Sequence, residues 1–211
     1  DWSSDVCSSD LDKQLLATVL TFEVSALIMG QDFKDVDVKM AEVLHVIGES
    51  NDSFATGMAY GMIASRKMMA GYNDDETKAM AAKGLAALKV SDNRFGYMMI
   101  SFALAMGARF SGRHEEAREQ FAQLIPFFLS LGDYHRSNMV RSETAHMDRL
   151  EGHYDEAIPR YRESIVEWKR LGHRAAVANQ FECFAFIAKA QEQPERAAIL
   201  LGAARSEEHT S

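Results

Sequence analysis

Two pairs of side chains have the spacing of metal ligands in helical proteins. Glu42 and His45 follow the pattern Glu-x-x-His, and so do Glu143 and His146. That spacing puts both side chains of a pair on one helix face, and helical bundles with two-metal centres draw ligands from two such pairs. Two further glutamates at convergent positions cannot be identified in the sequence. We therefore expect ordinary surface residues here, with no metal and no cofactor, and keep a helical-bundle metalloprotein as a lesser alternative.

Other catalytic motifs do not occur in the sequence. There is no Gly-x-x-x-x-Gly-Lys-Ser/Thr phosphate loop, no Gly-x-Ser-x-Gly nucleophile turn and no Cys-x-x-Cys pair. Cys183 lies among Phe181, Phe184 and Phe186, which is typical of a small buried apolar residue. We predict that this chain is not an enzyme.

The composition is that of an ordinary globular protein. The 211 residues are 47% hydrophobic and 26% charged, with a formal net charge of −8. An acidic balance disfavours a protein that coats nucleic acid, because such binding depends on neutralising phosphates. No apolar run approaches the roughly 18 residues of a membrane-spanning helix, so we expect no membrane contact.

The two ends of the chain differ in character from the rest. Residues 1–11 and 205–211 resemble the translation of one sequencing-adapter DNA read on opposite strands, in which AGATCGGAAGAGCACACGTCT encodes Arg-Ser-Glu-Glu-His-Thr-Ser. We exclude both segments from the fold prediction. Residues 12–204 then carry a net charge of −4 and a single cysteine, Cys183. We expect an internal fragment of a longer cytoplasmic protein.

A period of about forty residues runs through the sequence. Gly30, Gly71, Gly112 and Gly152 each follow an apolar helical stretch, at steps of 41, 41 and 40 residues, and Glu192 lies forty residues further on. Such a period predicts stacked helix pairs, and no segment shows the alternation of a strand, so we predict an all-α fold. The expected repeats are about 12–51, 52–92, 93–132, 133–172 and 173–204. The expected first helices are 12–29, 52–70, 93–111, 133–151 and 173–191, and the second helices are 33–48, 74–90, 114–131, 154–171 and 194–204.

The turn and the helix that follows it resemble a known repeat. Gly-x-Tyr-Asp-Glu-Ala-x-x-x-Tyr at 152–161 is similar to the turn and second helix of a tetratricopeptide (TPR) repeat. That repeat places small residues where its two helices touch, so that their axes approach closely. The matching positions are Ala105/Ala117, Ala145/Ala157 and Ala185/Ala197, with Ala64/Glu76 and Glu23/Asp35 in the two less regular repeats. The resemblance implies a right-handed α-solenoid of about five TPR-like repeats; a HEAT-type solenoid is the alternative of similar period.

The last two repeats carry a more specific resemblance. The stretches 163–174 and 188–204 are similar to the C-terminal repeats of large bacterial signalling ATPases, which include LuxR/MalT-type transcription regulators and cyclase-linked regulators. The resemblance implies a scaffold or regulatory sensor region. It also implies protein or peptide partners, among them other domains of the parent chain, without direct nucleic-acid contact in this fragment.

In this repeat type the first helices line a concave face, which the resemblance makes the candidate binding surface. The positions carried over by register are Met99, Phe102, Met106, Arg109, Ser142, His146, Arg149, Asn179, Glu182, Phe186 and Lys189. Arg109, Arg149 and Lys189 recur every forty residues, and a column of such cations would hold the carboxylates or carbonyls of an extended peptide. The alternative, which we favour, is that each cation offsets the dipole at the end of its own helix.

The sequence leaves two further possibilities open. A small-molecule effector would need an enclosed apolar pocket in place of an open groove. Uncapped end repeats would expose apolar faces, so self-association is a second possibility.

Overall fold

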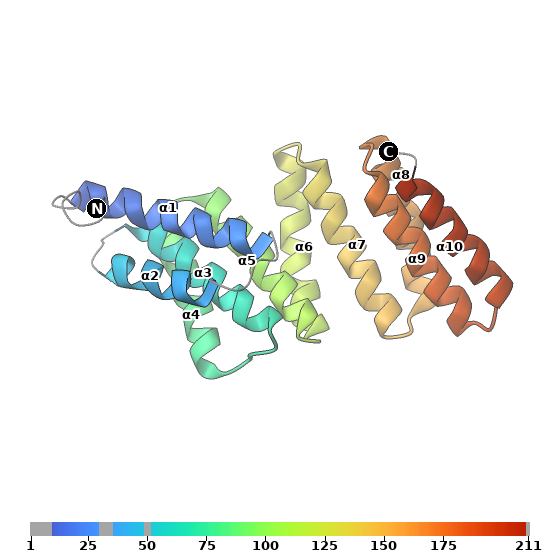
Figure 1. Cartoon of the computed structure of the whole chain (residues 1–211), viewed down its shortest axis with the longest axis horizontal. Helices are drawn as coiled ribbons and strands as arrows, with labels where there is room; N and C mark the ends of the chain where they lie inside the picture. The colour runs from blue at the N-terminus through green and yellow to red at the C-terminus, as the bar shows by residue number, and fades with distance from the viewer. Residues whose placement is uncertain (1–9, 30–35, 49–51, 210–211) are drawn as a thin grey trace. The chain divides into compact units, whose positions relative to one another are not determined.

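The computed structural model describes residues 10–29, 36–48 and 52–209, and every regular element in these ranges is an α-helix (Figure 1). The all-α prediction is therefore confirmed for this part of the chain. The ten helices are α1 (Asp10–Met29), α2 (Val36–Gly48), α3 (Ser53–Met69), α4 (Asp75–Val90), α5 (Arg94–Phe110), α6 (His114–Ser130), α7 (Tyr134–Leu150), α8 (Tyr154–Arg170), α9 (Arg174–Ala190) and α10 (Pro194–His209).

The observed helices agree with the expected ones in number and order. The largest difference lies at the C-terminal end, where α10 continues past residue 204 to His209. Helix α10 therefore includes most of the segment 205–211 that was excluded, and Glu207 forms an ion pair of 3.2 Å with Arg174 at the start of α9. Residues 1–9 lie outside the described residues.

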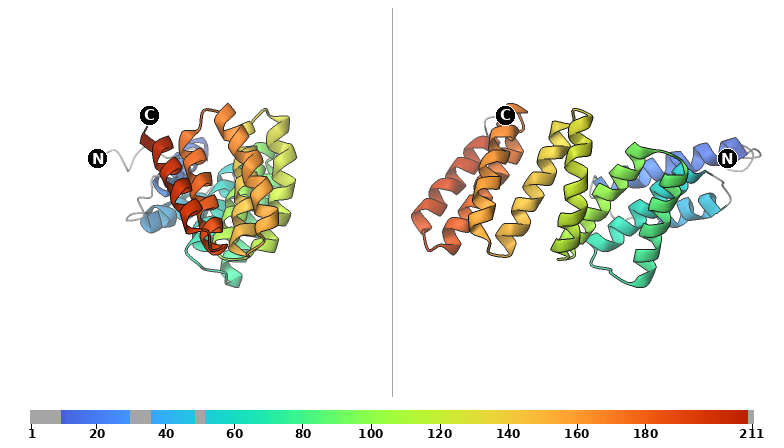
Figure 2. Two further views of the ribbon diagram at one scale, coloured as in Figure 1. Left: turned by 90° about the vertical axis from the view of Figure 1, so that its right-hand side faces the viewer. Right: turned by 180° about the vertical axis from the view of Figure 1, so that it is seen from behind.

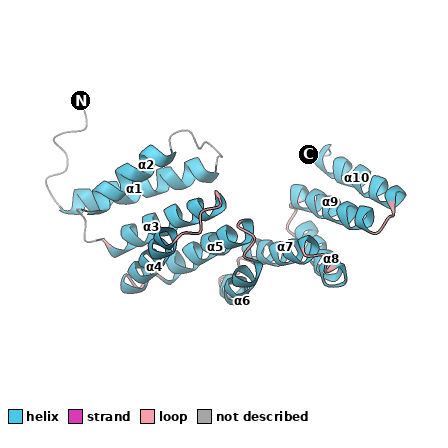
Figure 3. Cartoon of the chain, turned by 90° about the horizontal axis from the view of Figure 1, so that it is seen from below, coloured by secondary structure: helices cyan, strands magenta, loops and turns pink. Residues whose placement is uncertain are grey.

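The chain divides into two compact units whose border falls within α6, after Gln120. In the first unit, α3 packs against α1, α2, α4 and α5. Figure 3 shows α3 between the α1–α2 pair and the α4–α5 pair. Val43 and Ile63 belong to the apolar cluster on one side of α3, and Leu88 and Ile100 belong to the cluster on the other.

Three glycines allow α3 and α4 to approach closely. A Cβ atom on Gly84 would lie 2.7 Å from the backbone nitrogen of Gly61, and one on Gly57 would lie 2.9 Å from the carbonyl oxygen of Gly84. Neither distance is compatible with a side chain, so the contact depends on the missing Cβ atoms.

Of the two contact positions predicted between α3 and α4, one is buried and the other is not. Ala64 is fully buried, but Glu76 is exposed and pairs with Lys67 at 3.2 Å, and the buried residue beside it is Thr77. The turn at 70–74 is longer than the three-residue turn at 111–113, so the buried face of α4 begins one residue later than the glycine spacing predicts. Glu23 is exposed on α1, and its partner Asp35 lies outside the described residues.

In the second unit, α7 and α8 form a hairpin, α9 packs against both, and α10 packs against α9 (Figure 2). The buried cluster contains Ala145 of α7, Ala157 and Tyr161 of α8, and Cys183 and Ile187 of α9. The small-residue positions of this unit are therefore buried as predicted, except that Ala197 of α10 is half-buried.

The helix ends share one backbone conformation. The residue two positions after the last helical residue has a positive φ at seven consecutive helix ends, from α3 to α9. Five of these residues are glycines: Gly71, Gly112, Gly132, Gly152 and Gly172. Asp92 (φ 51°) and Glu192 (φ 58°) take the same left-handed conformation. At most of these ends the next backbone N–H donates back into the last turn, as from His153 to Asp148 O at 2.8 Å, which satisfies carbonyls that the helix leaves unpaired.

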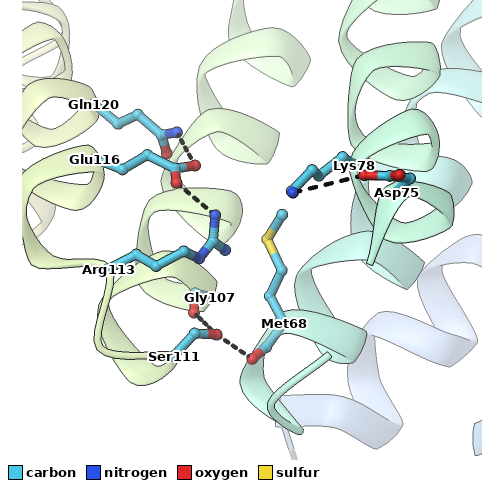
Figure 4. Close-up of polar contacts among 8 residues, drawn as sticks. All are labelled: Met68, Asp75, Lys78, Gly107, Ser111, Arg113, Glu116 and Gln120. Atoms are coloured by element: carbon cyan, nitrogen blue, oxygen red, sulfur yellow. Dashed lines mark hydrogen bonds and ion pairs between the residues drawn. The ribbon is translucent and has the colours of Figure 1, made fainter. Parts of the chain in front are cut away.

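Side chains also tie helix ends together. Ser111, just after α5, donates to Gly107 O of its own helix at 2.8 Å and contacts Met68 O of α3 at 2.5 Å (Figure 4). Asp133 accepts a hydrogen bond from the Arg136 N–H in the first turn of α7. Asp74 accepts one from the Thr77 N–H in the first turn of α4, and this bond lowers the pKa of the Asp74 carboxyl. Among the described helices, none has the length and apolar character needed to cross a bilayer.

Candidate functional site

The clearest exposed part of the predicted surface is one face of α9. Asn179, Phe186 and Lys189 are exposed there, with Phe186 54% accessible, and Glu182 is half-buried. The guanidinium carbon of Arg149 on α7 lies 5.3 Å from the centre of the Phe186 ring. A cation over an aromatic ring is attracted to it, so α7 and α9 together present an aromatic and cationic strip.

On α7, two of the predicted groove residues lie inside the second unit. His146 is buried, and its Nδ1 lies 2.8 Å from the Tyr161 hydroxyl and 3.4 Å from the Cys183 sulfur. The Tyr161 hydroxyl also accepts a hydrogen bond of 3.3 Å from Nε of Arg149. The four side chains form a polar cluster that links α7, α8 and α9.

Ser142 is the second buried member of the predicted surface. Its hydroxyl lies 2.6 Å from the Ser164 hydroxyl, donates to Asn138 O at 3.0 Å and accepts from Trp168 Nε1 at 3.0 Å. Asn138 in turn donates from its amide to Ser164 O at 3.0 Å. Ser142 therefore holds α7 and α8 together through hydrogen bonds and is not presented to a ligand.

The predicted positions on α5 belong to the first unit. Met99, Phe102, Met106 and Arg109 are all half-buried, and the Arg109 guanidinium lies 4.4 Å from the Phe110 ring. Arg109, Arg149 and Lys189 each lie in the last turn of their own helix, which supports the interpretation that they offset the helix dipole. The basic column itself joins residues of both units and stays a prediction.

The two Glu-x-x-His pairs also fall in different units. Glu42 and His45 are exposed on α2, where Glu42 accepts a hydrogen bond of 3.3 Å from Lys39. In the second pair Glu143 is half-buried, and His146 is engaged with Tyr161 as described above.

A different group of potential ligands gathers where α7 ends, and the sequence analysis missed it. The ligand atoms of Asp148, Glu151 and His153 lie within 4.8 Å of one another. Asp148 is buried and forms an ion pair with Arg160, so its carboxylate already has a cationic partner. The spacing i, i+3 followed by the turn was the only signal in the sequence.

Burial governs the acid–base behaviour of the buried cluster. It raises the pKa of the Cys183 thiol and that of the Tyr161 hydroxyl, because the ionised forms lose their hydration there. The thiol is therefore neutral at pH 7 and lacks the thiolate character of an activated nucleophile.

The hollows in the surface differ in kind. An apolar cavity in the first unit leaves no room for even a water molecule; its lining is Thr21, Val24, Met40, Val43, Ala59, Met62 and Ile63. An open groove of about 380 Å³ crosses the second unit; its lining is Arg162, Ile165, Val166, Phe181, Phe184, Arg196 and Leu200. The groove shares no residue with the predicted surface.

The second unit thus has two candidate interaction surfaces, one on each side of α9. Phe184 of the groove and Phe186 of the exposed strip are two residues apart, which corresponds to about 200° around a helix.

Comparison of the chain with protein-family models and with curated proteins gives no match in either case.

Proposed function

We propose that this chain is a TPR-like α-solenoid that acts as a protein-interaction scaffold or regulatory sensor module. Its parent would be a larger bacterial signalling or transcription-regulatory protein of the cytoplasm, and the module would have no catalytic activity of its own. The helix pairs, their forty-residue period and the recurring turns support this proposal.

The observation that carries the interaction role is the strip on α9. Phe186 is 54% exposed, Arg149 lies over its ring, and Lys189 is exposed one turn further along the same face. Exposed aromatic residues beside cations are enriched where proteins bind other proteins.

The small-molecule alternative has less support. It calls for an enclosed apolar pocket, whereas the enclosed apolar cavity lined by Val24, Val43 and Ile63 cannot hold a water molecule. The larger hollow, lined by Phe181 and Phe184, is open to solvent.

The test uses the 211-residue chain as immobilised bait in a bacterial extract. Each retained protein is identified, purified and titrated alone against the chain and two variants. We expect saturable binding of one partner that weakens at least about tenfold in Phe186→Ala/Lys189→Ala. Ile199→Ala is the matched control, because Ile199 is 73% exposed on α10 and lines neither surface.

Two results would contradict the proposal. One is native mass spectrometry that finds a stoichiometric small molecule or two metal ions per chain. The other is a set of retained proteins that, once purified, fail to bind the chain saturably.

A further inference from the structure

The open groove of the second unit is built by three helices. Phe181 and Phe184 of α9 form its floor, Ile165 of α8 and Leu200 of α10 form its sides, and Val166 of α8 lies at its rim with 69% exposure. Phe184 is anchored, since its ring centre lies 5.6 Å from that of buried Tyr161. Phe184 is therefore held against the buried cluster that contains Tyr161.

Positive charge surrounds this apolar floor. Arg162 of α8 and Arg196 of α10 line the groove, and the ammonium nitrogen of Lys169 lies 6.0 Å from the centre of the Phe181 ring. None of the lining residues carries a carboxylate. Within the described residues, Arg162 has no ion pair, and the contact of Arg196 is with the neutral amide of Gln193 at 3.0 Å. The charge of the residues that line the groove is thus opposite in sign to the net charge of −8 of the whole chain.

The aromatic residues of the groove do not recur at the corresponding positions of the preceding repeat. Forty residues before Phe181 and Phe184, the sequence has Arg141 and Thr144 on α7. The preceding helix α7 therefore has no aromatic residues at the two positions that correspond to Phe181 and Phe184. Phe181 and Phe184 thus interrupt the forty-residue pattern and give α9 a surface that the preceding repeat lacks.

We propose that this groove binds an amphipathic α-helix of a partner protein, one whose apolar stripe is flanked by Asp and Glu residues. The apolar stripe would lie on Phe181, Phe184 and Leu200, and the flanking carboxylates would pair with Arg162 and Arg196. Helix-in-groove recognition requires an apolar trough with charged edges, and the sign of those edges selects the partner. The inference rests on the proposed interaction function and assigns it a second surface, on the side of α9 away from Phe186.

The test titrates the 211-residue chain with a fluorescent synthetic helix that carries a leucine stripe flanked by glutamates. Two comparison peptides keep the stripe but exchange glutamate for lysine, or keep the glutamates but exchange leucine for serine. We expect both to bind at least about tenfold more weakly than the glutamate–leucine helix. Binding should also weaken as salt rises from about 0.05 M to about 0.5 M, because the flanking charges are solvent-exposed.

Variants of the chain locate the binding site. Arg162→Glu/Arg196→Glu should weaken binding at least about tenfold and shift preference toward the lysine peptide. Arg162→Gln/Arg196→Gln and Val166→Asp provide milder tests at exposed positions, with the fold checked by circular dichroism. Lys189→Glu and Val90→Asp are the matched controls, since Lys189 lies on the other side of α9 and Val90 is 77% exposed on α4.

The outcomes separate this inference from the function it rests on. If the groove variants fold and bind the acidic helix as the parent chain does, or if the lysine peptide binds equally well, the groove assignment is wrong. If a natural partner then depends on Phe186 and Lys189 alone, the interaction function stands without the groove. If the groove variants lose the acidic helix while Lys189→Glu keeps it, the inference is supported.

Discussion

The Tyr161 hydroxyl lies 2.8 Å from Nδ1 of His146, and both side chains are buried between α7, α8 and α9. Nε of Arg149 can only donate, so the hydroxyl accepts from it at 3.3 Å and its own hydrogen is available for His146. Cys183 completes the cluster at 3.4 Å from the same nitrogen. Polar groups from three helices are thereby satisfied in a single place, which fixes how α9 lies on the α7–α8 hairpin.

Alkaline pH should weaken the second unit through Cys183. Burial raises the pKa of this thiol in the folded chain, so the unfolded chain loses its thiol proton first, near the ordinary value of 9.0. The native state then binds more protons than the unfolded state, and the free energy of unfolding falls as pH rises above about 9. Urea unfolding from about pH 7 to about pH 10 should show this loss, with a shallower slope in Cys183→Ala. All samples carry Cys7→Ser so that a single thiol titrates. If the free energy of unfolding falls equally with pH in the presence and in the absence of Cys183, the assignment to this thiol is wrong.

Replacing Ser142 should cost stability and leave binding intact. Ser142→Ala removes the acceptor of Trp168 Nε1 and the partner of the Ser164 hydroxyl, both inside the protein. Leaving buried polar groups unpaired costs about 1–3 kcal/mol, which urea unfolding would measure. The purified partner should bind the folded variant with unchanged affinity. If Ser142→Ala instead weakens partner binding and leaves the free energy of unfolding unchanged, Ser142 belongs to the binding surface.

The sequence predicts the helices well and the exposure of their faces less well. Glycines at the helix ends mark the boundaries, because a positive φ there is a local property of the chain. The period also places Ser142, His146 and Phe186 on corresponding faces of α7 and α9. It cannot show that Tyr161 and Cys183 close over His146, since that depends on side chains from two other helices. The same limit applies to the groove, whose residues come from α8, α9 and α10.

Close helix approach makes Gly84 intolerant of a side chain. A Cβ there would lie 2.7 Å from a backbone nitrogen of α3, so Gly84→Ala must push α3 and α4 apart. We expect a loss of about 1–3 kcal/mol in the free energy of unfolding of the first unit. Gly202→Ala is the control, because a Cβ on Gly202 meets nothing within 4 Å and alanine favours α10 by up to about 1 kcal/mol. Equal effects of the two substitutions would show that helix propensity, and not the contact, decides the outcome.

Mild acid should weaken the second unit through His135. Its ring lies 5.1 Å from that of Trp168 and 5.0 Å from that of His173, and burial together with His173 lowers its pKa. The folded chain thus favours neutral His135, and this stability is lost as pH falls below the ordinary value of 6.5, where the unfolded chain takes up the proton. Unfolding at about pH 7.5 and about pH 5.5 should show a smaller difference in His135→Gln than in the parent chain. Equal differences in His135→Gln and in the parent chain would contradict this assignment.

The turn between α9 and α10 departs from the pattern of its neighbours and should be improvable. Glu192 has φ 58°, where five of the other six corresponding positions have glycine. A Cβ is strained in this conformation, and a carboxylate at the end of α9 opposes the helix dipole. Glu192→Gly should raise the free energy of unfolding by about 0.5–1 kcal/mol, less than the full strain because glycine also gains entropy in the unfolded chain. Glu192→Ala removes the charge and keeps the strain, so it separates the two causes. If the alanine and glycine variants are equally stable, the charge alone is responsible, and the left-handed backbone costs this turn nothing measurable.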